Sequence, residues 1–196
     1  MEEKNFGDFT IIKVTEKDID DILKFLYNDF LHEEPISSSI NITESEADKL
    51  YRDFVSMGAK SSLSYMLKDH DGHIVGLRLA SIIDRDGKQD GNEPIKIDIN
   101  KDPYQYTGES NQFSVKANHL KKILDELDDK IWITLNPRIT RLFNLIILSV
   151  DKYHRRQGLA EKLVNYNLEE IQQRGCQGIV VEATAIKSQE VPSFLL

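Results

Sequence analysis

Apolar and polar residues recur along the first third of this chain with periods that distinguish strands from helices. Residues 9–14 (FTIIKV) are rich in β-branched side chains and predict a strand. Residues 18–30 predict a helix, because their apolar side chains fall on one helical stripe: Ile19, Ile22, Leu23, Leu26 and Phe30. Residues 31–41 contain a proline and three serines and predict a loop, and residues 44–57 predict a second helix.

The middle of the chain contains a hairpin and a long polar segment. Residues 63–68 and 74–83 are apolar runs on either side of Asp69-His70-Asp71-Gly72, which is a turn signal. Residues 84–114 are polar, contain several glycines and prolines and show no clear period, so we expect a functional or mobile segment there. A third helix is predicted over residues 116–130.

The last third predicts a strand, a helix and a second strand. Residues 144–150 (NLIILSV) form a near-continuous apolar run that is typical of a strand buried on both faces. A long helix is predicted over residues 156–174, ended by Gly175, and a buried strand over residues 178–184. This order predicts a right-handed crossover between parallel strands. We therefore expect one α/β (α+β) domain over residues 1–196, with a mixed sheet and helices on its faces.

Composition and charge exclude several classes of protein. The chain has 196 residues, 40% hydrophobic and 30% charged, which is typical of one globular domain. Its net charge of −8 argues against nucleic-acid binding. The longest apolar run is too short to cross a membrane, and the N-terminus has no signal-peptide pattern. Cys176 is the single cysteine, so it cannot form an intramolecular disulfide, and we expect a structural role for it in a cytoplasmic protein.

The most informative stretch runs from Leu148 to Ala160, where a buried strand is followed by a short basic loop and a helix start. Helix N-termini present unpaired N–H groups to anions, and Gly158 lets the backbone approach a bulky one. Lys152, Arg155 and Arg156 add positive charge. A pyrophosphate suits this arrangement best. The alternative is a solvated turn with ordinary surface arginines, and the absence of a G-x-x-x-x-G-K-[ST] pattern argues against a nucleoside triphosphate site.

Residues 155–160 (RRQGLA) resemble the R/Q-x-x-G-x-G/A motif of the GCN5-related N-acetyltransferases. The resemblance implies a mixed, mostly antiparallel sheet flanked by helices, and acetyl-coenzyme A as cosubstrate without a metal. It implies that backbone N–H groups hold the pyrophosphate, from residues Arg155, Arg156, Gln157, Gly158, Leu159, Ala160 and Glu161. The strand edge at Leu148, Ser149 and Val150 would pair with the pantetheine arm, and one N–H near Val150 would donate to the thioester oxygen.

A second segment, residues 29–36 (DFLHEEPI), resembles the acidic Glu-Pro segment of invertebrate arylalkylamine N-acetyltransferases. That resemblance implies that Glu34 is the general base, with Glu33 and His32 as the next candidates, although a solvated loop carboxylate is the alternative. Residues 182–188 resemble the segment in which the family places a hydroxyl against the coenzyme arm, which implies a role for Ser188, next to Thr184. The acceptor would be a small primary amine such as an arylalkylamine or a polyamine; its identity and the oligomeric state stay open.

The resemblance ends near residue 190. After Ser188 the family continues with a helix and a last pair of strands, whereas this chain ends QEVPSFLL. We therefore expect a C-terminally truncated product that lacks the final strands. The alternative to an active enzyme is a truncated form that binds acetyl-coenzyme A or a protein partner and catalyses weakly or not at all.

Overall fold

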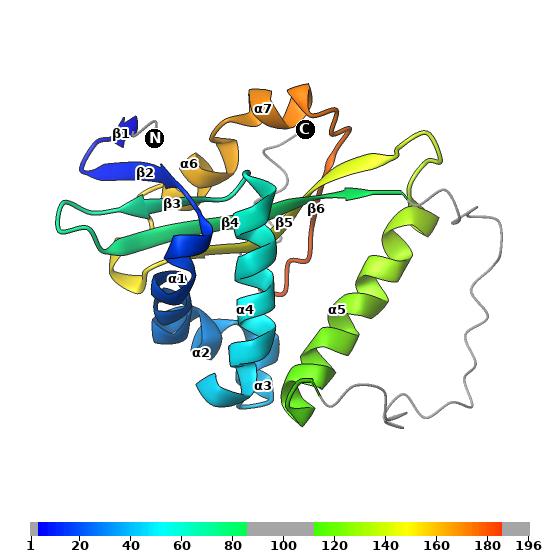
Figure 1. Cartoon of the computed structure of the whole chain (residues 1–196), viewed down its shortest axis with the longest axis horizontal. Helices are drawn as coiled ribbons and strands as arrows, with labels where there is room; N and C mark the ends of the chain where they lie inside the picture. Colours follow the sequence, from blue (N-terminus) through cyan, green and yellow to red (C-terminus); the bar gives the residue numbers. More distant parts are fainter. Residues whose placement is uncertain (1–3, 86–111, 186–196) are drawn as a thin grey trace.

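The protein is built on one twisted sheet of six strands in the order β1-β2-β3-β4-β5-β6, seen in the computed structural model, which describes residues 4–85 and 112–185 (Figure 1). The strands are β1 Lys4–Phe6, β2 Phe9–Lys13, β3 Tyr65–Lys68, β4 Ile74–Asp84, β5 Arg141–Val150 and β6 Ile179–Val181. Neighbouring strands are antiparallel except β5 and β6, which run parallel. The predicted mixed, mostly antiparallel sheet is confirmed.

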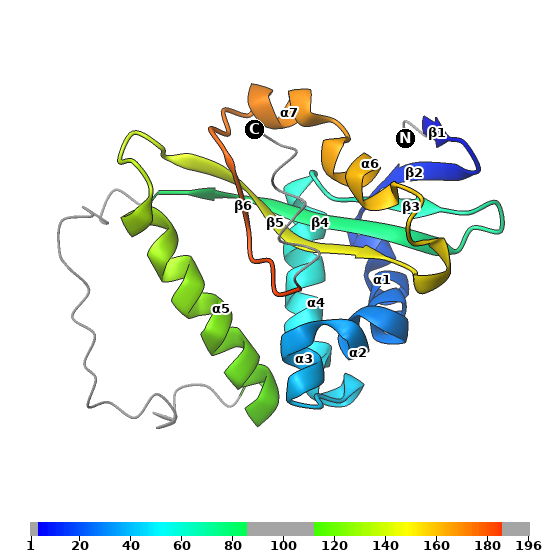
Figure 2. The same cartoon turned by 180° about the vertical axis from the view of Figure 1, so that it is seen from behind.

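Helices cover both faces of the sheet (Figures 1 and 2). One face carries the 3-10 turn Glu16–Asp18, α1 Ile19–Phe25, the π turn Leu26–Phe30, α2 Leu31–Glu33, α3 Pro35–Ser39, α4 Glu44–Ser61 and α5 Val115–Thr134. The other face carries α6 Leu159–Asn165 and α7 Leu168–Gln173, which follow the 3-10 turn Lys152–His154. None of the helices in the described ranges is both long and apolar enough to span a membrane.

Two apolar layers join the sheet to these helices. On the first face, Leu77 and Leu79 of β4 pack with Leu50 and Val55 of α4. On the second face, Leu67 and Val75 pack with Leu159 and Leu163 of α6, among others. As a result β4 is buried from Val75 to Ser81. The strand predicted over residues 144–150 also packs on both faces, through Ile147 in the first layer and Leu145 toward α6 and α7, but its last three residues are only partly buried.

The loop predicted over residues 31–41 is wrong, because the segment forms the short helices α2 and α3. Glu34 separates them in an extended conformation (ψ 122°), and its carboxylate accepts hydrogen bonds from the N–H groups of Ile36 and Ser37. Pro35 is at the first position of α3, where its missing N–H has no cost. A proline and an acidic cap that suggested a loop thus start a helix.

The single long helix predicted over residues 156–174 is also wrong. It begins only at Leu159, and it breaks at Tyr166 and Asn167 into α6 and α7. Asn167 is in the left-handed conformation, with φ +58°, which asparagine tolerates better than most residues. The strand predicted over residues 178–184 is shorter, Ile179–Val181. Most of the polar segment, residues 86–111, lies outside the described residues.

Candidate active site

The basic loop after β5 is shaped by two residues with positive φ. Arg156 has φ +62° and Gly158 has φ +72°. Left-handed backbone costs roughly 1–2 kcal/mol in a residue with a side chain, so Arg156 holds a strained conformation and Gly158 avoids one. A Cβ built on Gly158 meets no atom within 4 Å. The space in front of this glycine is therefore open, and a side chain there would fill room that a ligand can use.

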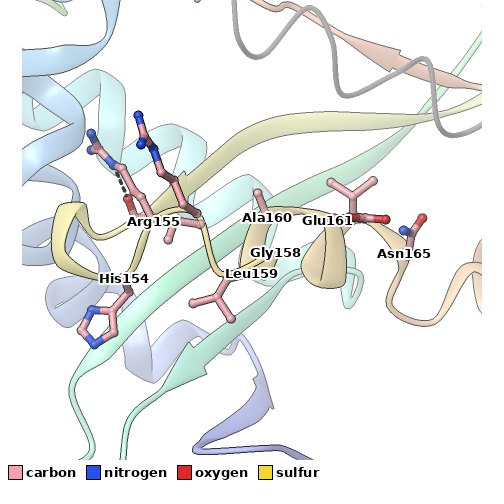
Figure 3. Close-up of a pocket in the computed structure, with 10 residues that line it drawn as sticks. His154, Arg155, Gly158, Leu159, Ala160, Glu161 and Asn165 are labelled. Atoms are coloured by element: carbon pink, nitrogen blue, oxygen red, sulfur yellow. Dashed lines mark hydrogen bonds between the residues drawn. The ribbon is translucent and has the colours of Figure 1, made fainter.

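A cavity of about 280 Å³ lies in front of this loop, and its lining is drawn in Figure 3. It brings together these predicted cofactor-binding residues: Val150, Arg155, Arg156, Gly158, Leu159, Ala160 and Glu161. Three others lie outside the lining. Leu148 packs in the apolar layers under α6 and α7, Gln157 is exposed, and Ser149 is partly buried in β5. Ser188 is outside the described residues, so its role stays a prediction.

Two cations of the loop form ion pairs within the protein, and a third is exposed to solvent. Lys152 is tied to the buried Asp29, whose carboxylate accepts from the Lys152 backbone N–H (3.0 Å) and pairs with its ammonium (3.0 Å). Although burial opposes ionisation, these bonds hold the pKa of Asp29 below its usual value. Arg155 pairs with Glu33 and donates Nε–H to the carbonyl of Val150 at 3.2 Å. Arg156 is exposed and makes no ion pair within the described residues, so it is the cation most available to an anion.

The outer edge of β5 opens beside this cavity. Pairing with β6 extends only from Phe143–Ile179 to Leu145–Val181 in the described ranges, whereas pairing with β4 continues to Val150. Beyond the strand, Asp151 donates its N–H to Val75 of β4, and the Val150 carbonyl faces the other way and accepts from Arg155. The N–H and C=O of one strand residue point to the same side, so the N–H of Val150 also points away from β4. This edge is the one from which the sequence predicted a donor to the thioester oxygen.

A β-bulge interrupts β5 a few residues before that open edge. Leu79 pairs with Ile147 but Ala80 pairs with Leu145, so Ile146 is an extra residue in β5. As a result Ile146 and Ile147 both face α4 and α5, whereas Leu145 and Leu148 face α6 and α7. Bulges bend strands and re-aim side chains, and they are frequent near active sites. The apolar run gave no sign of this extra residue.

A second cavity, of about 350 Å³, lies on the bulged side of β5, between the sheet and α4 and α5. Glu34, the predicted base, is in its lining, together with the aromatic side chains Phe30, Tyr51, Phe54 and Phe113. The two fallback candidates are placed elsewhere: Glu33 pairs with Arg155, and His32 is exposed. Ile147 of this cavity and Val150 of the first are three residues apart, about 10 Å along a strand.

The chain matches no protein-family model and no curated protein sequence, but its structure matches many solved structures. Arylalkylamine N-acetyltransferase 2 from Aedes aegypti superposes with a TM-score of 0.71 at 26% identity, over 96% of this chain and 82% of that one. The chain therefore has the fold of the GCN5-related N-acetyltransferases. A polyamine N-acetyltransferase from Drosophila melanogaster has a TM-score of 0.67 at 17% identity, over 96% of this chain and 82% of that one. At that lower identity, the likeness shows the fold alone.

The acetyltransferase fold places on one cavity wall several residues that the sequence analysis did not single out. Asp125 and Asp128 come from α5, Asn144 from β5, and Glu182 directly follows β6. Burial, followed by repulsion from Asp128 and Asp125, raises the pKa of Glu182 to about 7. Ile179 and Val181 pack toward α7, so strand alternation turns Glu182 to the opposite face. The sequence shows this alternation but not which face meets the cavity.

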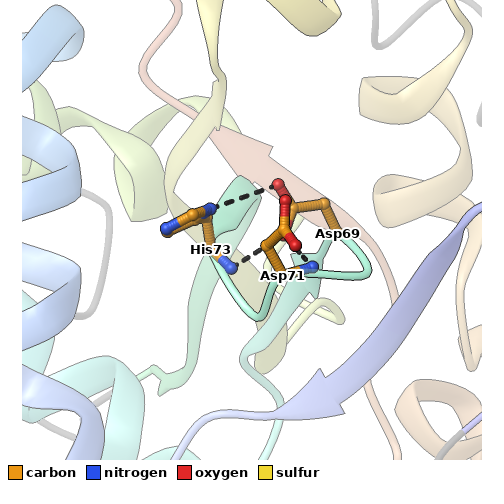
Figure 4. Close-up of side chains that lie close together, drawn as sticks. All are labelled: Asp69, Asp71 and His73. Atoms are coloured by element: carbon orange, nitrogen blue, oxygen red, sulfur yellow. Dashed lines mark hydrogen bonds and ion pairs between the residues drawn. The ribbon is translucent and has the colours of Figure 1, made fainter.

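A group of possible metal ligands occurs at the β3–β4 turn, remote in sequence from either cavity's lining. Oxygen and nitrogen atoms of Asp69, Asp71 and His73 lie within 4.8 Å of one another (Figure 4). Asp69 Oδ1 already accepts the backbone N–H groups of Asp71 (3.0 Å) and His73 (2.8 Å), which closes the turn. This arrangement explains the turn itself, and it lends no support to a metal role in the acetyltransferase chemistry.

Proposed function

We propose that this acetyltransferase transfers the acetyl group of acetyl-coenzyme A to the primary amine of a small molecule. The observation that carries the proposal is the pair of cavities beside β5: one faces the basic loop and the other is acidic. A cosubstrate that brings a pyrophosphate to the first and an acyl group to the strand between them would meet an amine held in the second. The Aedes arylalkylamine N-acetyltransferase, at 26% identity, supports this class of reaction.

The first cavity fits the pyrophosphate end of acetyl-coenzyme A. The N–H groups at the start of α6 and Arg156, which has no ion-pair partner in the described part of the chain, would hold phosphate oxygens in the room in front of Gly158. The edge of β5 at Leu148, Ser149 and Val150 would hold the amide-bearing arm as an added strand does, through Leu148 and Val150. The outward N–H of Val150 would then stabilise negative charge on the acyl oxygen during transfer. Acetyl-coenzyme A supplies the activated acetyl group.

The second cavity fits an amine, and Glu34 would act on it as the base. An ammonium cannot attack an acyl carbon, so one proton must first pass to a base. Glu34 would take that proton, directly or through a water molecule. The amine then forms the new N–C bond as the C–S bond breaks, and the departing thiolate takes up the second proton, which the acetylated nitrogen releases. Each oxygen of Glu34 accepts one backbone N–H, which fixes the carboxylate and leaves further lone pairs for the amine.

The cytoplasmic location stays a prediction from the sequence.

Thermal unfolding with and without acetyl-coenzyme A tests the first cavity. At about one hundred times its dissociation constant, a ligand of the folded state adds about 2.7 kcal/mol, a rise of roughly 5–10 °C in Tm for a chain of this size. Gly158→Glu should abolish this rise, because the new side chain fills and charges the phosphate space.

Gly175→Glu is the matched control, since Gly175 also has positive φ (+79°) with no atom near a built Cβ, but it lies after α7. Both variants carry the same backbone strain and the same added charge. If acetyl-coenzyme A stabilises Gly158→Glu as much as the parent, the cofactor site is elsewhere. Acetylation of amines by the parent protein, followed by thiol release, then tests the transfer itself, and Glu34→Gln should reduce kcat by at least about 100-fold.

A further inference from the structure

The acceptor cavity has two chemically different ends. At one end Glu34 lies beside Tyr51, whose pKa is raised to about 12 by burial and by the Glu34 charge, against a lowering hydrogen bond from Ser37. At the other end, Asp125 and Asp128 of α5 line the cavity together with Glu182, which follows β6. The apolar side chains of Phe54 and Leu124 are among those that line the remaining wall.

The second end has more negative charge than the protein neutralises. Lys121 is the only basic side chain among the described residues of the lining, and it is engaged by Asp125 on the next turn of α5 at 2.5 and 2.7 Å. Glu182 Oε1 is fully buried and accepts no hydrogen bond from any described residue. Asp128 is exposed at the rim, and desolvation, then Asp125 and Asp129, raise its pKa, against a lowering influence of Lys121. Among the described residues, Glu182 and Asp128 therefore face the cavity with Lys121 as the one cation of its lining, and Asp125 already engages that cation.

A buried carboxylate without a partner is unfavourable, and a ligand cation is the group that would remove that cost. An aryl ring at this end would instead place an apolar surface against Glu182 and Asp128 and leave both charges uncompensated. The cavity, at about 350 Å³, is near the lower limit of ligand sites, which favours a short acceptor over a peptide.

We propose that Glu182 and Asp128 form a cation-binding subsite, so that the preferred acceptor carries a second positive charge, as a short linear diamine or an amino-guanidine does. This inference rests on the proposed function and specifies its substrate class. The reacting amine would lie at the Glu34 end and the second cation at the Glu182 end. Two anionic ends joined by apolar walls match two cations joined by methylene groups.

The test compares kcat/KM for 1,4-diaminobutane, 1-aminobutane and 2-phenylethylamine with saturating acetyl-coenzyme A. The parent should prefer 1,4-diaminobutane to 1-aminobutane by about 10- to 100-fold, the size expected for one charge-assisted contact. In Glu182→Gln/Asp128→Asn that preference should fall to within about threefold.

Two further variants keep the result interpretable. Glu126→Gln removes one charge from α5 at an exposed position outside the cavity lining and should retain the diamine preference. Asp128→Lys, at an exposed position, places a cation in the subsite and should abolish diamine use while 1-aminobutane is still acetylated. The acetyl-coenzyme A thermal shift confirms that each variant is folded.

The outcomes separate the two proposals. If kcat/KM for 1-aminobutane or 2-phenylethylamine equals that for 1,4-diaminobutane, or if the double variant keeps the diamine preference, the subsite is refuted while amine acetylation stands. If the folded parent acetylates none of the three amines, the proposed function and the subsite both fail.

Discussion

At the scale of single residues, the protein holds two groups in unfavourable states near its cavities. Arg156 adopts a left-handed backbone that favours glycine, and Glu182 keeps a carboxylate oxygen buried without a hydrogen bond from any described residue. Strain concentrates at sites where a ligand can relieve it. Both residues lie on cavity walls, one at the basic loop and one at the proposed cation subsite. Their cost in the free protein is what a bound ligand would recover.

Glu182→Gln should stabilise the free protein in a pH-dependent way. The pKa of Glu182 is about 7 in the folded state, against 4.5 ordinarily, so the folded protein binds a proton that the unfolded chain releases. The stability that Glu182 contributes is therefore present below pH 4.5 and is lost as the pH rises to about 7. Repulsion from Asp125 and Asp128 of α5, which face Glu182, strengthens this pH dependence.

The measurement is Tm at pH 5 and pH 8 for the parent and Glu182→Gln. The variant should exceed the parent at pH 8, and the difference should shrink at pH 5. Glu126→Gln, on the exposed side of α5, should show no such pH dependence. An equal difference at both pH values would mean that the Glu182 carboxyl titrates normally.

At the scale of elements, Arg78 of β4 determines where α6, the helix after the basic loop, ends. Its buried guanidinium donates to the carbonyls of Leu163 (2.7 Å) and Tyr166 (2.8 Å) in the α6 region, and to that of Leu63 before β3 (3.0 Å). It also lies over the rings of Tyr65 and Phe143. These bonds satisfy the last carbonyls of α6, which lets the chain leave the helix at Tyr166. Arg78 is thus a positioning residue for α6.

Arg78→Met should destabilise the protein by about 3–5 kcal/mol, because several buried carbonyls lose their donor. It should also weaken acetyl-coenzyme A binding, since α6 begins at the phosphate loop. Urea unfolding and a thermal-shift titration measure the two effects.

Arg52→Met is the matched control. In the described part of the chain Arg52 makes exposed ion pairs with Asp20 and Asp48, and such pairs contribute little. A loss in stability without a loss in cofactor affinity would show that Arg78 supports the fold but does not position the loop.

At the scale of the whole molecule, charge is distributed unevenly around β5. The chain has a net charge of −8, yet a basic loop lies at one end of this strand's open edge and an acidic cavity lies on its bulged side. A net negative protein attracts cations from a distance, whereas an anion must be held by local groups such as Arg156. The proposed pair of ligands, one anionic and one cationic, suits this division.

Salt should therefore affect the two amine substrates unequally. Raising the salt concentration from 0.1 M to 1 M shortens the screening length from about 10 Å to about 3 Å. KM for 1,4-diaminobutane should rise more steeply than KM for 1-aminobutane, because two charges are attracted in place of one. Steady-state kinetics at saturating acetyl-coenzyme A measure both slopes, and equal slopes would contradict a second cation subsite.

The amino-acid sequence by itself determined the elements whose signals are local. The apolar stripe of α4, the hairpin of β3 and β4 around Asp69 and Gly72, and the parallel pairing of β5 with β6 were all predicted, because periodicity and turn residues act over a few positions. The motif at residues 155–160 predicts a phosphate loop, because it combines a glycine with basic residues, and its phosphate role stays a prediction.

Only the tertiary structure decided the features that depend on distant partners. The bulge at Ile146 follows from the register with β4, and α6 ends where Arg78, 85 positions before Leu163, reaches its carbonyls. Glu182 meets Asp128 because β6 and α5 fold onto one cavity. Each residue's type was visible in the chain, but its role required a neighbour that sequence distance conceals, since burial and electrostatic coupling depend on separation in space.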